Sequence, residues 1–176
     1  MSTALPSSLR IAVGDAVVYA AHGVGRVAAR ERKLVAGAER EYIVIDLAEG
    51  LRVMLPVEEA AERLRAVVDD AGLRHVQRTL AEKPGVRDGS WTKRINESKT
   101  KLATGRAIDL AELVRDGARH ELPDKAVPRL THGERRLYLQ ARQLLVQEIC
   151  SAQGIEQAEA DEWVEAQIAL PEESGG

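Results

Sequence analysis

Residues 41–56, EYIVIDLAEGLRVMLP, decide the fold of the first part of the chain. The run EYIVIDL is rich in β-branched side chains, which favour strands. AEG then supplies a tight turn, and LRVML forms a second apolar run that a proline closes. The stretch therefore predicts two consecutive strands. Side chains alternate along a strand, so the second strand has two faces, one with Leu51, Val53 and Leu55 and one with Arg52 and Met54.

Further short apolar runs flank this pair on both sides. They are Ala16–Tyr19, Gly25–Ala28 and Leu64–Val68. Five short strands in the first part of the chain are typical of a small Tudor- or SH3-like β-barrel. Residues 23–28, GVGRVA, also match the G-x-G-x-x-A dinucleotide fingerprint, but that motif must open a helix. A strand pattern follows these glycines, so we assign them to a hairpin and reject a nucleotide cofactor.

After residue 68 the apolar spacing changes to the period of helices. Five helices are predicted, and their signals include Asp69 or Asp70 and Ser90 as N-caps, Pro123 as a stop and a capping box at residues 131–134, THGE. The fold class is therefore α+β. We expect a flexible N-terminal extension over residues 1–9, a Tudor-like module over 10–68, a compact helical domain over 69–170 and a disordered tail over 171–176.

The net charge of −3 conceals an uneven distribution along the chain. Residues 67–106 carry nine Lys and Arg against five Asp and Glu, whereas residues 151–176 carry seven acids and no base. A local basic surplus of this kind is compatible with nucleic-acid binding although the whole chain is acidic. The single cysteine, Cys150, fits a reducing compartment, and no apolar run is long enough for a signal peptide or a membrane span. We therefore expect a cytoplasmic protein.

The residues that usually carry catalysis are scattered. His22, His75, His120 and His132 lie far apart, without Cys or Glu partners at metal-ligand spacing. No Ser, His and Asp set can be defended. We therefore expect no metal, no cofactor and no enzymatic activity.

The segment GSWTKR, residues 89–94, places one of only two tryptophans in a Gly-rich stretch of a chain that has no Phe. In one interpretation Trp91 packs onto the helical bundle, because Ile95 and Leu102 share its helical stripe. In the other it projects from the first turn as a wedge into a distorted minor groove. The cations that would then hold phosphates are Lys93, Arg94, Lys99, Lys101 and Arg106. The pattern alone leaves both interpretations open.

Arg52 and Met54 also admit two interpretations. Their side of the strand can simply face solvent. Alternatively, the strand lies at the edge of the sheet and pairs with a partner protein through its backbone, while these side chains give specificity.

With these elements placed, the chain resembles the bacterial CarD family of transcription factors (the CarD/CdnL group). The resemblance is carried by an ordered set of segments: VGDAVVY at 13–19, HG at 22–23, EY at 41–42, VMLP at 53–56, WTKR at 91–94, KLATG at 101–105, LAELVRD at 110–116, GERR at 133–136 and ARQLLV at 141–146. It covers roughly residues 10–170. Ile95 and Asn96 stand where the family often has an aromatic residue and a cation, which predicts a lower affinity for DNA than in those family members.

The resemblance implies a Tudor-like domain that binds the β subunit of RNA polymerase, as in the transcription-repair coupling factor. It also implies a helical domain that touches promoter DNA at the upstream edge of the transcription bubble. There Trp91 would wedge into the minor groove and slow bubble collapse, with Lys93 and Arg94 on the backbone. We add Lys99 and Lys101 for their charge. The positions that match the polymerase contact are Lys33, Arg52, Val53 and Met54.

The expected protein is thus a monomeric, non-enzymatic regulator in the bacterial nucleoid that stabilises the open promoter complex. Its binding to DNA would involve the minor groove and backbone with little sequence specificity. The alternative is an adaptor whose β module binds polymerase while its helical domain binds another protein.

Overall fold

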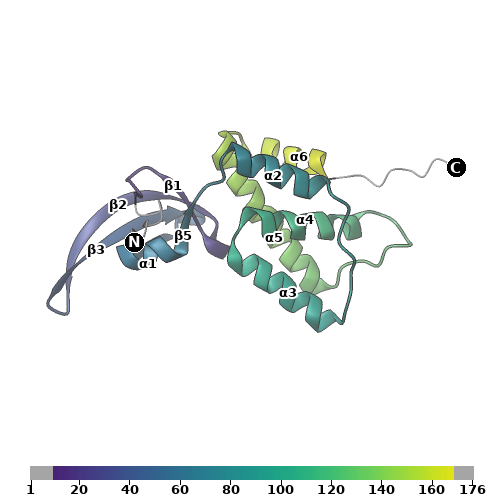
Figure 1. Cartoon of the computed structure of the whole chain (residues 1–176), viewed down its shortest axis with the longest axis horizontal. Coiled ribbons are helices and arrows are strands. Elements are labelled where there is room, and N and C mark those ends of the chain that lie inside the picture. The colour runs from purple at the N-terminus through teal and green to yellow at the C-terminus, as the bar shows by residue number, and fades with distance from the viewer. Residues whose placement is uncertain (1–9, 169–176) are drawn as a thin grey trace, which may run out of the picture. The chain divides into compact units, whose positions relative to one another are not determined.

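The computed structural model describes residues 10–168 (Figure 1). The predicted extension over residues 1–9 and the predicted tail over 171–176 lie outside the described residues. The chain divides into two compact units between Val67 and Val68. Unit 1 is a β-sheet with one short helix, and the regular elements described in unit 2 are all helices, so the predicted α+β class is confirmed. Over the described range no helix is both long and apolar enough to cross a membrane.

Unit 1 contains one five-stranded antiparallel sheet in the order β4-β3-β2-β1-β5. Short 3-10 turns at Ala20–His22 and Ala48–Gly50 join β1 to β2 and β3 to β4. Helix α1 lies between β4 and β5 and was not predicted. The elements are β1 (Ala16–Tyr19), β2 (Val24–Val35), β3 (Ala38–Leu47), β4 (Arg52–Pro56), α1 (Val57–Arg63) and β5 (Leu64–Ala66).

The predicted strand EYIVIDL is the centre of this unit. Ile43, Ile45 and Leu47 of β3 are buried together with Val27 of β2. Gly25 lies so close to β3 that a Cβ atom on it would stand 2.6 Å from Ile45 Cγ2 and 2.8 Å from Leu47 Cδ2. Gly25 is therefore required by packing, and the GVGRVA segment runs into a strand. This finding excludes the helix that a dinucleotide fingerprint needs.

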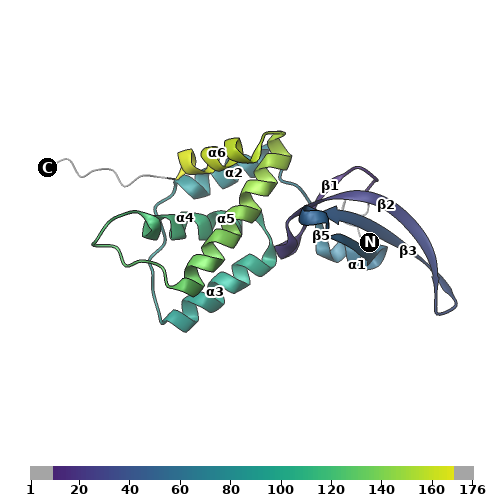
Figure 2. The ribbon, with the colours of Figure 1, turned by 180° about the vertical axis from the view of Figure 1, so that it is seen from behind.

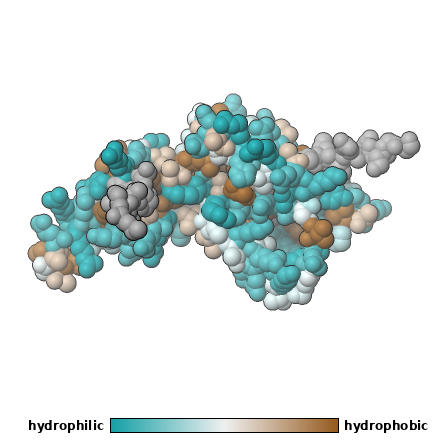
Figure 3. Space-filling model, in the orientation of Figure 1, coloured by the Kyte–Doolittle hydropathy of each residue, from teal (hydrophilic) through white to brown (hydrophobic). Residues whose placement is uncertain are grey.

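Strands β2 and β3 extend beyond their other partners as a two-stranded arm. β1 pairs with β2 only up to Arg26, and β4 pairs with β3 only from Tyr42 onward. The arm ends in exposed apolar side chains, Leu34 at 74% and Val35 at 43% exposure, visible as brown and tan atoms at its tip in Figure 3. Lys33 lies on this arm, with its Nζ 3.3 Å from Glu31.

Unit 2 contains the five predicted helices. They are α2 (Asp70–Ala81), α3 (Trp91–Thr104), α4 (Ala107–Glu121), α5 (His132–Gln153) and α6 (Gln157–Gln167). The predicted caps are confirmed: the side chains of Asp69, Ser90 and Thr131 accept hydrogen bonds from the first turns of α2, α3 and α5. The chain enters this unit at Val68, whose N–H donates to the side chain of Glu148 at 3.0 Å.

Helices α4 and α5 form the middle of unit 2 (Figures 1 and 2). Helix α2 packs on α4 and α6, whereas α3 packs on α4 and α5. Gly117 of α4 leaves room for the ring of Tyr138, which a Cβ atom would displace. The core includes Leu80, Leu110, Val114, Leu145, Ile149 and Val164.

Candidate nucleic-acid interface

Trp91 is the first residue of α3, and half of it is accessible to solvent (51%). Ile95 and Leu102, which share its stripe, are buried at 7% and 6% exposure. The stripe is therefore core along the helix and leaves the core at its first turn. A side chain at a helix start can extend past the last packed layer of the core. The Trp91 side chain is therefore partly packed and partly accessible to solvent.

The indole is fixed against another helix. Its Nε1 donates a hydrogen bond to the Oγ1 atom of Thr131 at 3.0 Å, and Thr131 is the N-cap of α5. A Cβ atom placed on Gly133 would lie 3.8 Å from Trp91 Cζ2, so the ring rests beside the first turn of α5. Figures 1 and 2 show α3 and α5 beginning at the same end of unit 2.

The five cations predicted near Trp91 fall into two groups. Lys93 is exposed and lies 3.8 Å from the equally exposed Glu97, and Lys99 forms no ion pair with any residue between 10 and 168. In contrast, Lys101 pairs with Glu112 of α4 at 2.7 Å, Arg106 pairs with Asp109 at 2.8 Å, and Arg94 pairs with Glu134 at 2.9 Å. Of these five cations, only Lys93 and Lys99 present a largely uncommitted charge, and they follow Trp91 by two and eight positions on α3.

Glu134, the capping-box residue of α5, accepts hydrogen bonds from two guanidinium groups. Arg94 Nε donates to one oxygen of Glu134 at 2.9 Å, and Arg87 Nη2 donates to the other at 2.5 Å. The Glu134 side chain is 8% exposed. Burial alone would raise its pKa, but the hydrogen bonds from Arg87, Thr131 and Arg94 outweigh that effect and lower the pKa from 4.5 to about 2.

Neither Arg87 nor this role of Glu134 was predicted. The capping-box pattern identified Glu134 as a local partner of Thr131, which the structure confirms. Its partners on α3 and on the loop before α3 are tertiary contacts, separated from it by 40 and 47 positions. No local pattern could therefore reveal them.

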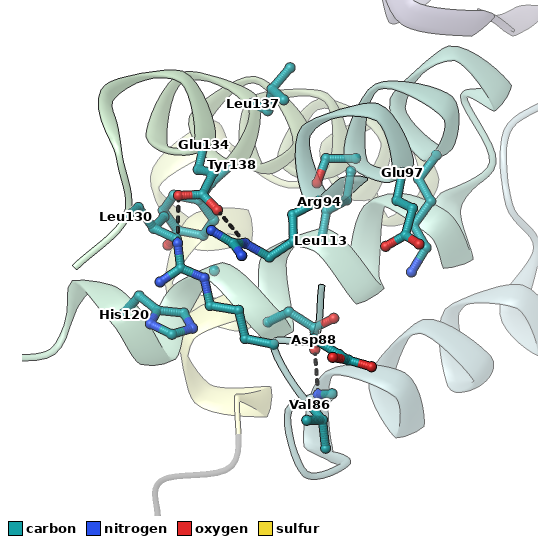
Figure 4. Close-up of a pocket in the computed structure, with 16 residues that line it drawn as sticks. Val86, Asp88, Arg94, Glu97, Leu113, His120, Leu130, Glu134, Leu137 and Tyr138 are labelled. Carbon is teal, nitrogen blue, oxygen red and sulfur yellow. Dashed lines mark hydrogen bonds and ion pairs between the residues drawn. The ribbon is translucent and has the colours of Figure 1, made fainter. Parts of the chain in front are cut away.

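The loop of residues 82–90 crosses the face formed by α3, α4 and α5. The N–H of Gly85 donates to Asp116 at 2.8 Å, and Glu82 accepts from Arg115 at 3.1 Å. Under the loop lies a cavity of about 150 Å³, and Figure 4 shows Arg94 and Glu134 joined by a dashed line among the residues that line it. Among the described residues, no group of three or more His, Cys, Asp or Glu could hold a metal ion.

The predicted protein-binding residues lie on β4 and on the arm. β4 is an edge strand, since β3 is its only strand partner among residues 10–168. Met54 is 39% exposed and Leu55 is buried, which confirms the predicted alternation, whereas Leu51 precedes the strand and is 51% exposed. Arg52 forms a bidentate ion pair with Asp46 of β3, and the hydrogen bond from Arg52 lowers the pKa of Asp46.

A small β-sheet with an unpaired edge strand and a helical unit that exposes a tryptophan near lysines are features of a binding protein with two interaction surfaces. Comparison with known proteins identifies its family. The model of the CarD C-terminal domain matches residues 75–165, and that of the CarD-like/TRCF RID domain matches residues 11–68. The chain belongs to the CarD family of transcription factors.

A named relative agrees with this assignment. The chain is similar to "Putative transcription factor YdeB" of Bacillus subtilis (strain 168), with 29% identity over 145 residues. The match covers 81% of this chain and 92% of the relative. The resemblance predicted from the ordered segments is therefore confirmed along most of the chain.

Proposed function

We propose that this protein binds the β subunit of RNA polymerase through unit 1 and promoter DNA through unit 2, and so stabilises the open promoter complex. The observation that carries the proposal is the position of Trp91. It is a half-exposed indole at the start of a capped helix, fixed by a hydrogen bond and followed on the same helix by two available lysines, Lys93 and Lys99. An accessible aromatic that is already oriented is suited to occupy an unstacked base step.

The geometry supports a division of roles within unit 2. Trp91 would enter the minor groove at the upstream edge of the bubble, where base pairs are already strained. Unstacking a step costs a few kcal/mol, so a wedge binds best where the DNA has partly opened. Lys93 and Lys99 would hold phosphates. The ion pairs of Arg94 and Lys101 give these two residues a structural role beside any contact with DNA.

Unit 1 would hold the polymerase by adding β4 to a strand of the β subunit. An edge strand offers unpaired N–H and C=O groups for this pairing. Arg52, Val53 and Met54 lie along that strand, and Lys33 lies on the arm. The effect on initiation then follows from differential affinity, since a ligand shifts an equilibrium only by the ratio of its affinities for the two states.

The first prediction concerns salt. Binding to free duplex DNA should be weak and should fall with salt, because phosphate contacts release counterions. Replacing Lys93 and Lys99 by alanine should lower the slope of log K against log salt by about 2, roughly one unit for each lost phosphate contact. Fluorescence anisotropy of a labelled promoter duplex, titrated at several salt concentrations, measures this slope.

The matched control removes two cations from another helix of the same unit. Arg74 and Arg78 are exposed on α2, which packs on α4 and α6 rather than beside α3. Their double alanine variant should keep the wild-type slope. Equal slopes for both double variants would contradict the assignment of the DNA surface to α3. A tight, sequence-specific complex with duplex DNA alone would contradict the proposed function.

The second prediction tests the polymerase contact. Met54→Glu places a charge on the exposed face of β4 and should prevent the strand from pairing with the β subunit. We expect loss of polymerase binding in a pull-down or interferometry assay. At concentrations where the wild type prolongs the open complex, the variant should leave its lifetime unchanged. Val13→Glu is the control, because Val13 is also exposed in unit 1 (58%) but precedes β1. Undiminished binding by Met54→Glu would exclude β4.

A further inference from the structure

A chain of hydrogen bonds connects the Trp91 indole to the interior of unit 2. Trp91 Nε1 donates to Thr131 Oγ1 at 3.0 Å, and Thr131 Oγ1 donates to a carboxylate oxygen of Glu134 at 2.8 Å. The same hydroxyl accepts from the backbone N–H of Glu134 at 3.4 Å. A hydroxyl has one donor and two acceptor sites, and here all three are used. The direction of its proton is fixed, because both other partners are donors.

The carboxylate at the end of this chain accepts four hydrogen bonds. One oxygen of Glu134 accepts from Arg94. The other accepts from Arg87, from the backbone N–H of Thr131 at 2.9 Å and from the Thr131 hydroxyl. Three donors thus converge on one oxygen and a single donor binds the other, and only an ionised carboxylate, which has no proton of its own, can accept them all. The acceptor that holds the Thr131 hydroxyl therefore cannot turn without breaking other bonds.

The network also holds the backbone that carries Trp91. Arg94, one turn further along α3, binds Glu134 through Nε and the carbonyl oxygen of Gly89 through Nη1 at 2.8 Å. Arg87 binds the same carboxylate from the loop. The segment on both sides of Trp91 and its indole nitrogen are thus anchored to one buried carboxylate at the start of α5. A half-exposed tryptophan without such anchors would sample several side-chain rotamers.

We propose that Thr131, supported by Glu134, is a positioning residue that holds the Trp91 ring in the orientation in which it enters the minor groove. This inference rests on the proposed function of Trp91 as a wedge. The physical reason is preorganisation: a side chain already held in its bound rotamer loses less conformational freedom on binding. Thr131 contributes by orienting Trp91 and need not touch DNA itself.

The test replaces the hydroxyl by a methyl group in the full-length protein. Thr131→Val is nearly isosteric, whereas Thr131→Ser keeps the hydroxyl and serves as the control. In a Trp163→Phe background, Trp91 gives the single indole N–H signal in NMR. Its exchange with solvent should accelerate roughly 2- to 10-fold in Thr131→Val, the range expected for the loss of one hydrogen bond, and stay near wild type in Thr131→Ser.

Open-complex lifetime, measured with polymerase, is the functional readout. Thr131→Val should shorten it by roughly 2- to 10-fold in a chain that contains Trp91 and should have no further effect in a Trp91→Ala chain. Equal shortening in both backgrounds would mean that only the lost helix cap matters, which overturns the inference. If Thr131→Val does not fold by circular dichroism, Thr131→Gly replaces it, because glycine caps helices well without a hydroxyl.

The experiments distinguish a failure of the proposed function from a failure of the positioning role of Thr131. If Trp91→Ala shortens the lifetime and Thr131→Val does not, the positioning role is wrong and the proposed function stands. If Trp91→Ala has no effect, the proposed function is wrong and the positioning role has no functional meaning.

Discussion

Replacing Trp91 by alanine is expected to shorten the lifetime of the open promoter complex between about fivefold and about 150-fold, relative to the complex with wild-type protein. The range corresponds to the roughly 1–3 kcal/mol that stacking of one base on an aromatic side chain contributes. Binding to polymerase should be unchanged, because Trp91 lies in unit 2 and the predicted polymerase residues lie in unit 1. Competitor-challenge decay of the complex measures the lifetime.

The variant should remain folded. Half of Trp91 is already accessible and its ring makes one hydrogen bond, so its removal should cost about 1 kcal/mol of stability. Trp163→Phe is the matched control, since Trp163 is the other tryptophan of the chain, on α6 and partly buried. An adaptor whose helical unit binds another protein would show no change in lifetime with Trp91→Ala. Such a result would favour the adaptor over the DNA contact.

Replacing Glu134 by glutamine should give the largest loss of stability among these variants, about 3 kcal/mol at pH 7. This value follows from a pKa lowered from 4.5 to about 2, because one unit of pKa corresponds to about 1.4 kcal/mol. The amide has one acceptor oxygen and introduces two donors, so it cannot serve the four donors that surround the carboxylate. Urea unfolding followed by circular dichroism measures the free energy of unfolding.

The pH dependence gives a second readout of the same carboxylate. Its folded-state pKa lies below its unfolded-state value, so the stabilisation is complete above about pH 5 and is lost as the pH falls toward 2. The wild type should therefore lose about 3 kcal/mol more than Glu134→Gln over this range. Glu97→Gln is the control, because the Glu97–Lys93 pair is exposed and such pairs contribute at most about 1 kcal/mol. Parallel pH profiles of wild type and Glu134→Gln would contradict the role of the buried network.

Most of the fold was predictable because its signals are local. Asp69, Ser90 and Thr131 cap the helices that follow them, and each cap depends on bonds within a few residues. The β-branched run of β3 likewise contains its own strand preference. Helix α1 was missed because seven residues are too few to show a helical period, although two acids follow Pro56 and favour a helix start.

The candidate site was only partly predictable, for a reason that follows from its contacts. The sequence placed Trp91 at a helix start among cations but left its packing open, since exposure depends on what α5 brings beside it. It could not distinguish Arg94 and Lys101 from Lys93 and Lys99. The acids that bind Arg94 and Lys101 come from α5 and α4, and their arrival is decided by tertiary packing.

The connection between β5 and α2 is short, which matters if the two units bind separate targets, as proposed above. Only residues 67–69 separate the two elements, and the N–H of Val68 is tied to Glu148. Even fully extended, three residues span roughly 10 Å. A short tether gives the second contact a high effective concentration when the two target surfaces lie within its reach, and almost none otherwise. If unit 1 binds polymerase and unit 2 binds DNA, as proposed above, the short connection would favour complexes in which the two target surfaces lie within its reach.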